Sequence, residues 1–415
     1  MSHVLLVHGE ARQIPLADQS CHCIVTSPPF WGLRDYQVQD QLGLEALHDC
    51  AGAFTGEQCV ECFVCHLRQV ARELWRVLRD DGTFWMNLGD SYTSGGRIGH
   101  GTRLSAKQRT NRGMNGTNDP PRAPQPVGLT EKNLIGIPWR VALALQADGW
   151  TLRSAITWCK SAPMPESVQD RPTSATEMVF LLTKHPTYFF DAEAVREYEG
   201  SGWHGSSFQS AYAQETKQRL GKHPRHETPG RNLRNFWVLG PHHYAGAHFA
   251  TFPTALVERC LKAGTSEAGC CTQCRAPWIR QVERIKGEAA SYNGSSFTKG
   301  KTHEARAPLA AVGQGPRTAQ VLLTGWAPSC ACEAGAPMPC VALDPFVGSG
   351  TTLLVARALG RDGVGMDLSY SYLYDQARTR LQLDALAAWE GRNGHHAPGT
   401  HSDLPLFAGG EEPNA

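Results

Sequence analysis

The sequence predicts an α/β fold, in which hydrophobic strands alternate with helices around a shared sheet. In residues 67–78 apolar side chains recur at helical spacing, and a turn at 80–82 leads into an apolar strand at 83–88. Nearer the C-terminus, an apolar strand at 341–343 is followed by a glycine-rich loop, a helix at 351–359 and a strand at 363–366. Both stretches have the order of elements that α/β proteins use.

The same signals place the remaining elements. We expect strands at 4–7, 23–25, 153–158 and 178–182, and helices at 137–147, 253–263 and 372–387. Gly264 is expected to form the C-terminal cap of the helix at 253–263. Three polar stretches with many basic residues interrupt the pattern at 93–133, 195–235 and 266–337. The tail, 391–415, is rich in Gly, His and Pro and is expected to be disordered.

The composition narrows the class of protein. Forty Lys and Arg against 39 Asp and Glu give a net charge of +1, which excludes a uniformly basic protein that coats DNA. There is no run of about 18 apolar residues, so no membrane span is expected, and the apolar run near the N-terminus is too short for a signal peptide. We therefore expect a cytoplasmic protein, in which 14 cysteines indicate metal binding more than disulfides.

A glycine loop near the C-terminus indicates a cofactor site. The strand at 341–343 ends in an acid, the loop turns on two glycines, and a second acid ends the next strand. These positions are Asp344, Gly348, Gly350, Thr351 and Asp367. The arrangement is typical of sites for nucleoside-containing cofactors, where the glycines admit the ligand and the second acid binds the ribose hydroxyls. An ordinary strand–turn–helix connection is the alternative.

The loop favours S-adenosylmethionine (SAM) over cofactors rich in phosphate. A phosphate-binding loop would carry lysine before Thr351, where Gly350 stands. A dinucleotide-binding loop would have glycine in place of Leu353. Asp344 would repel a pyrophosphate, but it suits a ligand that carries sulfonium and ammonium groups.

A second motif, Ser27-Pro28-Pro29-Phe30, indicates a pocket for a planar group that carries an amine. The two prolines stiffen the backbone and lack N–H groups, so hydrogen-bond acceptors gather beside an aromatic ring. Ser27 and the neighbouring carbonyls would accept the amine hydrogens, and Phe30 would stack on the ring. Such bonds direct the lone pair of the amine toward a methyl donor. A proline-stiffened turn at the end of a strand is the alternative.

Together the two motifs resemble those of the DNA amino-methyltransferases, which methylate N4 of cytosine or N6 of adenine. Other segments look similar to this family as well: 8–10, 81–90, 153–160, 165–167 and 248–253. The resemblance implies that 81–90 flanks the target pocket. It also implies further contacts to SAM from Glu10, Ala250, Phe252 and Phe346.

The order of the motifs has a structural consequence. The catalytic motif precedes the cofactor loop, which is the circularly permuted order of the beta group of this family. The resemblance therefore implies that strands from both ends of the chain share one SAM-methyltransferase (Rossmann-like) sheet. The catalytic domain would be discontinuous and would carry the three polar stretches as insertions, with 195–235 as a candidate for DNA recognition. Its expected parts are 1–92, 134–194, 236–265 and 338–390.

The form of the catalytic motif bears on the substrate. In this family Ser-Pro-Pro is associated with cytosine N4 and Asp-Pro-Pro with adenine N6. The resemblance thus implies SAM-dependent methylation of cytosine in double-stranded DNA, with adenine as the alternative. The base would flip into the pocket beside Phe30, and the basic insertions would hold the DNA backbone and read base edges. A cognate restriction endonuclease as a partner, and the oligomeric state, are left open by the sequence.

Two groups of cysteines have the spacing of metal ligands. The stronger candidate for structural zinc is the set Cys271, Cys274, Cys330 and Cys332. The weaker set, where zinc is simpler than an iron–sulfur cluster, is Cys50, Cys59, Cys62 and Cys65. Reduced buried thiols are the alternative for both. Cys270 could compete as a ligand, whereas Cys260 and Cys340 are expected in the core. Cys340 follows a proline, as the nucleophile of carbon-5 cytosine methyltransferases does, but its place before the cofactor strand argues for burial.

Two further functions are open on sequence alone. One is a non-catalytic, zinc-stabilised DNA-binding protein that keeps the SAM fold, and the intact motifs argue against it. The other keeps the fold but methylates RNA or a protein glutamine, for which Asn-Pro-Pro is more typical.

Overall fold

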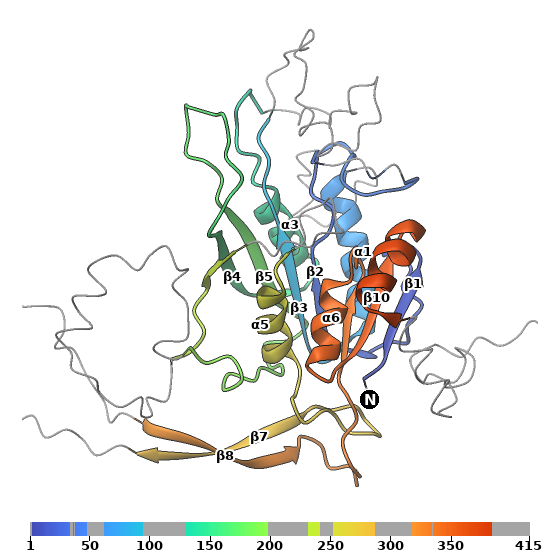
Figure 1. Cartoon of the computed structure of the whole chain (residues 1–415), viewed down its shortest axis with the longest axis vertical. Helices are drawn as coiled ribbons and strands as arrows, with labels where there is room; N and C mark the ends of the chain where they lie inside the picture. The colour runs from blue at the N-terminus through green and yellow to red at the C-terminus, as the bar shows by residue number, and fades with distance from the viewer. Residues whose placement is uncertain are drawn as a thin grey trace, which may run out of the picture.

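One eight-stranded sheet forms the centre of the protein (Figure 1). The computed structural model describes residues 2–33, 36, 38–47, 62–93, 129–197, 231–240, 252–286, 318–333 and 335–383. The strand order in the sheet is β1-β10-β9-β2-β3-β5-β4-β6. The strands are β1 (Val4–His8), β2 (Cys21–Thr26), β3 (Leu78–Leu88), β4 (Thr151–Lys160), β5 (Thr176–Thr183), β6 (Phe236–Leu239), β9 (Val341–Asp344) and β10 (Asp362–Asp367).

Strands from both ends of the chain lie side by side in this sheet, as the order of the motifs predicts. β1 pairs in parallel with β10, with Val4 opposite Gly363, and β2 pairs in parallel with β9. The five strands from β1 to β3 in the sheet order are all parallel, whereas β5 runs antiparallel to both of its neighbours. The fold is therefore α/β with a permuted sheet. The exact limits expected for the catalytic domain stay a prediction.

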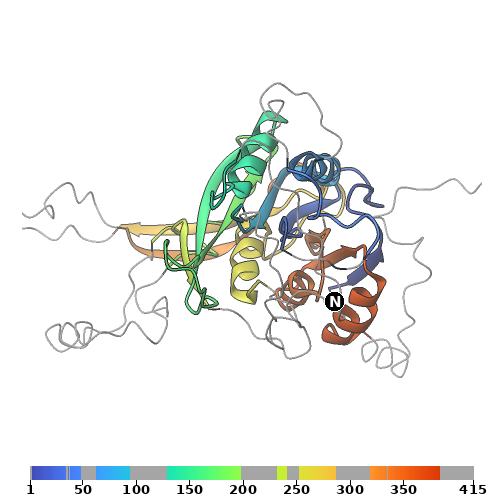
Figure 2. The same cartoon turned by 90° about the horizontal axis from the view of Figure 1, so that it is seen from above.

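Helices cover both faces of the sheet (Figure 2). One face packs on α1 (Phe63–Val77) and α3 (Ile137–Ala147), the other on α5 (Thr254–Gly264) and α6 (Thr351–Ala358). The strands follow the alternation of side chains that a sheet buried on both faces requires. In β3, for example, Phe84 belongs to the first core and Trp85 to the second.

Two predicted boundaries are wrong, and in both cases a glycine has a different role. α1 ends at Val77 and β3 starts at once, so the turn expected at 80–82 lies inside the strand. A Cβ atom at Gly82 would lie 2.9 Å from the carbonyl oxygen of His22, so glycine is needed for packing. Likewise Gly264 is the last residue of α5 and not its cap, which is Thr265. A Cβ there would lie 2.2 Å from Thr83 Oγ1, so glycine lets the helix approach the sheet.

Some elements are absent from the sequence-based prediction. β6 is one, and a two-stranded antiparallel ribbon is the other, formed by β7 (Trp278–Lys286) and β8 (Thr318–Pro328) within the third polar stretch. The helix expected at 372–387 is a π-helical turn, η3 (Tyr372–Ala377), followed by the short α7 (Arg378–Arg380). Residues 384–415, with the predicted disordered tail, and most of 93–133 and 195–235 lie outside the described residues. Among the helices of the described part, none has the length and apolar character needed to span a membrane.

Candidate active site

The two predicted motifs meet at one edge of the sheet. The Ser27–Phe30 loop follows β2, and the glycine loop follows β9. Because β2 and β9 are parallel neighbours, their carboxyl ends lie at the same edge, where open α/β sheets bind ligands. β10 ends there as well, with Asp367 as its last residue.

Asp344 joins the two loops. Its Oδ1 accepts a hydrogen bond of 2.6 Å from the Thr26 hydroxyl at the end of β2. Its Oδ2 accepts a bond of 2.7 Å from the Thr352 hydroxyl in α6, and the backbone N–H of Phe346 donates to Oδ1. The side chain is buried, and burial raises the pKa of this carboxyl to about 6. A direct contact with a cofactor stays a prediction, whereas the fastening of both loops to one carboxyl is a feature that the sequence did not reveal.

The glycine loop has the conformation that its glycines suggest. Gly348 and Gly350 have φ angles of +48° and +82°, in the left-handed region that favours glycine. Asp367 holds the loop from the neighbouring strand, because its Oδ2 accepts a 2.9 Å bond from the N–H of Gly348. Its Oδ1 accepts a bond from the N–H of Ser369, and burial raises the pKa of the Asp367 carboxyl. Each carboxylate oxygen can accept more than one hydrogen bond, so ribose hydroxyls can still be accommodated.

The remaining predicted cofactor residues come from several segments, one of which lies outside the described part. Thr351 begins α6 and is buried, and its hydroxyl accepts a 2.7 Å bond from Arg380, which the sequence did not single out. Glu10 follows β1 and forms an ion pair with Arg12. Phe346 and Phe252 are partly buried and pack against the cores on opposite faces of the sheet. Ala250 lies outside the described residues.

Phe30 sits against a glycine at the end of β3. A Cβ atom at Gly89 would lie 2.6 Å from Cε2 of the Phe30 ring, so only glycine leaves room for the ring in this position. Pro28 is buried, whereas Ser27, Pro29 and Phe30 are half-buried and thus reachable from the sheet edge. The aromatic ring predicted to stack on a substrate is therefore held in place by the strand that flanks it.

Ser27 takes part in a chain of polar side chains that crosses the sheet. Its hydroxyl donates to Asn87 Oδ1 in β3 over 3.1 Å. Asn87 Nδ2 in turn donates to Glu177 Oε2 at 3.0 Å and to the carbonyl oxygen of Met178 at 3.2 Å, both in β5. Glu177 forms an ion pair with Lys160 at the end of β4. Asn87 is buried, so its amide has one well-determined orientation.

This orientation defines what Ser27 can do. Because both acceptors lie on the nitrogen side of Asn87, its oxygen faces Ser27 and takes the hydroxyl hydrogen. The lone pairs of Ser27 Oγ then remain available to accept a hydrogen from a ligand. The resemblance placed 81–90 beside the pocket but did not distinguish Asn87. In the sequence, Asn87 is the single polar residue within the apolar run 84–88, and this was the available signal. Nothing in the sequence singled out Glu177 or Lys160.

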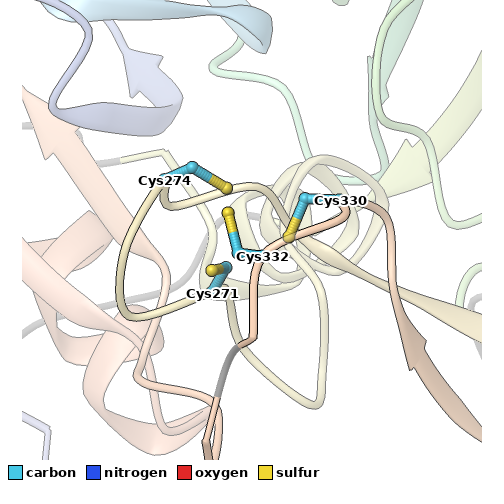
Figure 3. Close-up of side chains that lie close together, drawn as sticks. All are labelled: Cys271, Cys274, Cys330 and Cys332. Atoms are coloured by element: carbon cyan, nitrogen blue, oxygen red, sulfur yellow. The ribbon is translucent and has the colours of Figure 1, made fainter.

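Six of the twelve cysteines in the described part of the chain lie in two groups that could hold a metal ion. The sulfurs of Cys271, Cys274, Cys330 and Cys332 all lie within 4.8 Å of one another. Figure 3 shows these four side chains gathered together. A second group consists of His22, Cys270 and Cys340. Cys260 and Cys340 are buried, as predicted, and Cys340 precedes the amino end of β9, away from the catalytic loop. Cys62 and Cys65 are buried too, but Cys50 and Cys59 lie outside the described residues, so the weaker metal site stays a prediction.

Comparison with known proteins identifies the family. A family model described as DNA methylase, of the N6/N4 methyltransferase type, matches residues 21–272 and 337–378, which is more than half of the chain. The chain belongs to the N6/N4 DNA methylase family. The match contains both the Ser27–Phe30 loop and the glycine loop. It leaves out residues 273–336, which include the β7–β8 ribbon and three of the four cysteines in the Cys271–Cys332 cluster.

Individual type II methyltransferases are similar to this chain over much of their length. The type II methyltransferase M.Cfr9I of Citrobacter freundii is 43% identical over 262 residues, which cover 63% of this chain and 72% of the relative. The type II methyltransferase M.SfiI of Streptomyces fimbriatus is 30% identical over 401 residues, covering 87% and 86%. Among solved structures, the cytosine-N4-specific PvuII DNA methyltransferase aligns with 94% of each chain at a TM-score of 0.46 and 13% identity.

Proposed function

We propose that this DNA methylase transfers a methyl group from SAM to the N4 amine of cytosine in double-stranded DNA. The observation that carries the proposal is the hydrogen bond of Ser27, whose hydroxyl hydrogen is taken by Asn87 so that the oxygen lone pairs remain available to accept. An exocyclic amine offers hydrogens to such an acceptor. The same edge holds the glycine loop, which Asp344 ties to the strand before Ser27.

The residues at the edge fit SAM. Gly348 and Gly350 give the backbone a close approach to a ligand, and Asp367 offers carboxylate oxygens for ribose hydroxyls. Phe346 and Phe252 supply apolar surface. When bound, SAM supplies a methyl group on a positively charged sulfur.

The residues of this chain position the other reactant. The amine of a base is a poor nucleophile because its lone pair is delocalised into the ring. Ser27 Oγ and the carbonyls of the proline-stiffened loop accept the amine hydrogens, which localises the lone pair. Phe30 stacks on the base and fixes its plane, and Gly89 behind the ring fixes Phe30. Orientation of this kind supplies much of the acceleration in a transfer between two bound reactants.

The choice of base rests on the serine. The Ser-Pro-Pro form of the motif is associated with cytosine N4 in this family, and Ser27 is the residue present. Methylation of adenine N6 is the alternative. In either case the amine is inaccessible in a stacked duplex, so the base must flip out of the helix. DNA contacts by the polar stretches at 93–133, 195–235 and 266–337 belong to the proposal as well.

The biological setting follows from the same proposal. The names of relatives, type II methyltransferases, support our proposal that the enzyme acts alongside a cognate restriction endonuclease. Its substrate is cellular DNA, so we place it in the cytoplasm. SAM is the cofactor of the reaction, and a structural zinc ion is argued below.

Single-molecule sequencing of DNA from cells that express the protein tests the proposal. It reports the modified base, its position and the surrounding sequence together. We expect N4-methylcytosine at one short recognition sequence. N6-methyladenine instead would support the alternative base, and absence of any modified base would support a non-catalytic DNA-binding protein.

A further inference from the structure

We propose that Cys271, Cys274, Cys330 and Cys332 hold a structural zinc ion that fastens the β7–β8 ribbon to the sheet edge opposite the catalytic loop. This inference is independent of the proposed methyl transfer. It concerns a part of the chain that the family model leaves largely unmatched, because the match stops at residue 272 and resumes at 337.

The four sulfurs have the arrangement that zinc requires. All lie within 4.8 Å of one another, and tetrahedral Zn–S bonds of about 2.3 Å imply sulfur–sulfur distances of about 3.8 Å. Figure 3 shows that two come from the turn after α5 and two from the segment after β8. Four protein ligands complete the coordination, so the ion has no open position for a substrate and its role is structural.

The local backbone supports thiolate ligands. Cys271 and Cys274 lie in a tight turn in which the N–H of Gln273 donates to Cys271 Sγ over 3.4 Å. The N–H of Arg275 donates to the carbonyl oxygen of Cys271 at 3.0 Å and closes the turn. An N–H directed at a sulfur stabilises negative charge there, as a metal-bound thiolate needs.

The cluster joins the two ends of the ribbon. β7 begins four residues after Cys274, and β8 ends two residues before Cys330. The strands already pair up to these ends, with Trp278 opposite Pro328, and two side-chain hydrogen bonds extend the contact toward the cysteines. Ser329 Oγ donates to the carbonyl oxygen of Pro277 at 2.6 Å, and Gln273 Nε2 donates to that of Glu333 at 3.3 Å. A metal that binds all four sulfurs closes the base of the ribbon.

The same turn is attached to the amino ends of two central strands. Arg79, at the start of β3, donates to the carbonyl oxygen of Cys274 at 2.9 Å. His22, at the start of β2, contacts the carbonyl oxygen of Arg275 at 2.8 Å. Ser27 follows the other end of β2, which at about 3.3 Å per residue places it roughly 15–20 Å away along the strand. The zinc site therefore lies outside the reaction site.

The neighbouring group of His22, Cys270 and Cys340 is not a metal site. His22 Nδ1 accepts a 3.0 Å bond from the N–H of Val341, which leaves the ring proton on Nε2. Nε2 donates that proton to the carbonyl oxygen of Arg275. Both ring nitrogens are occupied, so neither has a lone pair for a metal. This group thus provides a control next to the proposed ligands.

The test compares zinc content between two matched variants of the full-length protein. Metal is measured by inductively coupled plasma mass spectrometry after purification under reducing conditions without chelator. Cys274→Ser changes an exposed cysteine and should remove one zinc ion per chain relative to the wild type. Cys270→Ser changes the adjacent control group and should keep it. The test measures how much zinc each variant loses relative to the wild type. A second ion bound by the Cys50–Cys65 set would therefore not affect the result.

Three outcomes would overturn the proposal: no zinc in the wild type, iron in its place, or loss of zinc in Cys270→Ser but not in Cys274→Ser. A second measurement tests the proposal without a substitution, in case Cys274→Ser folds poorly. A zinc-selective chelator added to the wild type should lower the melting temperature while the Kd for SAM, measured below that temperature, stays within about twofold. An unchanged melting temperature after complete zinc removal would also contradict the proposed role. Because the Kd for SAM is measured separately from the zinc content, failure of the zinc proposal can be distinguished from failure of the methyltransferase proposal.

Discussion

The Thr26 hydroxyl donates a 2.6 Å hydrogen bond to the buried carboxyl of Asp344, across the boundary between β2 and β9. These residues are 318 positions apart in the chain, and each directly precedes one of the two motifs. Thr352 donates to the other carboxyl oxygen from the start of α6. One carboxyl therefore sets the spacing between the loop proposed to hold the target amine and the loop proposed to hold SAM.

Removal of the Thr26 hydroxyl should loosen this junction. Thr26→Val keeps the shape of the side chain but leaves a buried carboxyl oxygen with one donor fewer. We expect the free energy of unfolding to fall by about 1–3 kcal/mol and the methylation rate to fall more than this destabilisation explains at permissive temperature. Urea unfolding and methyl-transfer assays measure both. Thr151→Val on the distant strand β4 is the matched control, and equal effects of the two variants would contradict the junction's role.

The raised pKa of Asp344 predicts a pH dependence of stability. Burial raises this pKa from 3.8 to about 6, so between about pH 4 and 6 the folded protein binds more protons than the unfolded chain. The contribution of this carboxyl to the free energy of unfolding therefore falls as pH rises through that window, by at most about 3 kcal/mol. Asp344→Asn abolishes this contribution. Its free energy of unfolding should decline less than that of the wild type between pH 4 and 6.5, whereas parallel curves would refute the assignment.

Asn87 should act only through Ser27. Asn87→Ala lets the Ser27 hydroxyl rotate, and we expect kcat to fall roughly 10- to 100-fold with the Kd for SAM unchanged. The distinguishing measurement is a double-mutant cycle with Ser27→Ala. If Asn87 positions Ser27, the double variant is no slower than Ser27→Ala alone. Multiplicative effects would show that Asn87 contributes independently.

Gly89 should be intolerant of a side chain because of Phe30. In Gly89→Ala the new Cβ would start 2.6 Å from the aromatic ring and force it to move. We expect weaker DNA methylation, by about 10-fold or more, with SAM binding retained. Gly335→Ala is the control, since a Cβ there meets no atom within 4 Å. Wild-type activity in Gly89→Ala would show that the ring position is unimportant.

Sequence patterns predicted the parts of the fold that are encoded locally. α3 has the limits that its apolar spacing and proline indicate, Ile137–Ala147. The shared sheet followed from motif order, since β1 and β10 can pair only if both ends of the chain meet. Glycine at 348 and 350 is required by left-handed backbone, as a glycine loop suggests.

The features that sequence missed depend on contacts between distant segments. Gly82 and Gly264 look like turn and cap residues, but each is glycine because another segment packs against it. The link from Asn87 to Glu177 depends on the pairing of β3 with β5. The β7–β8 ribbon lies within a polar stretch in which apolar and polar residues show little alternation. Its pairing joins segments separated by more than 30 residues.

The most direct test of the central claim is mass spectrometry of nucleosides from duplex DNA treated with SAM and purified protein, either wild type or Ser27→Ala. We predict N4-methyldeoxycytidine from the wild type and at least about 100-fold less from Ser27→Ala, with equal Kd for SAM. Equal product from the two proteins, or N6-methyldeoxyadenosine as the product of the wild type, would contradict the account.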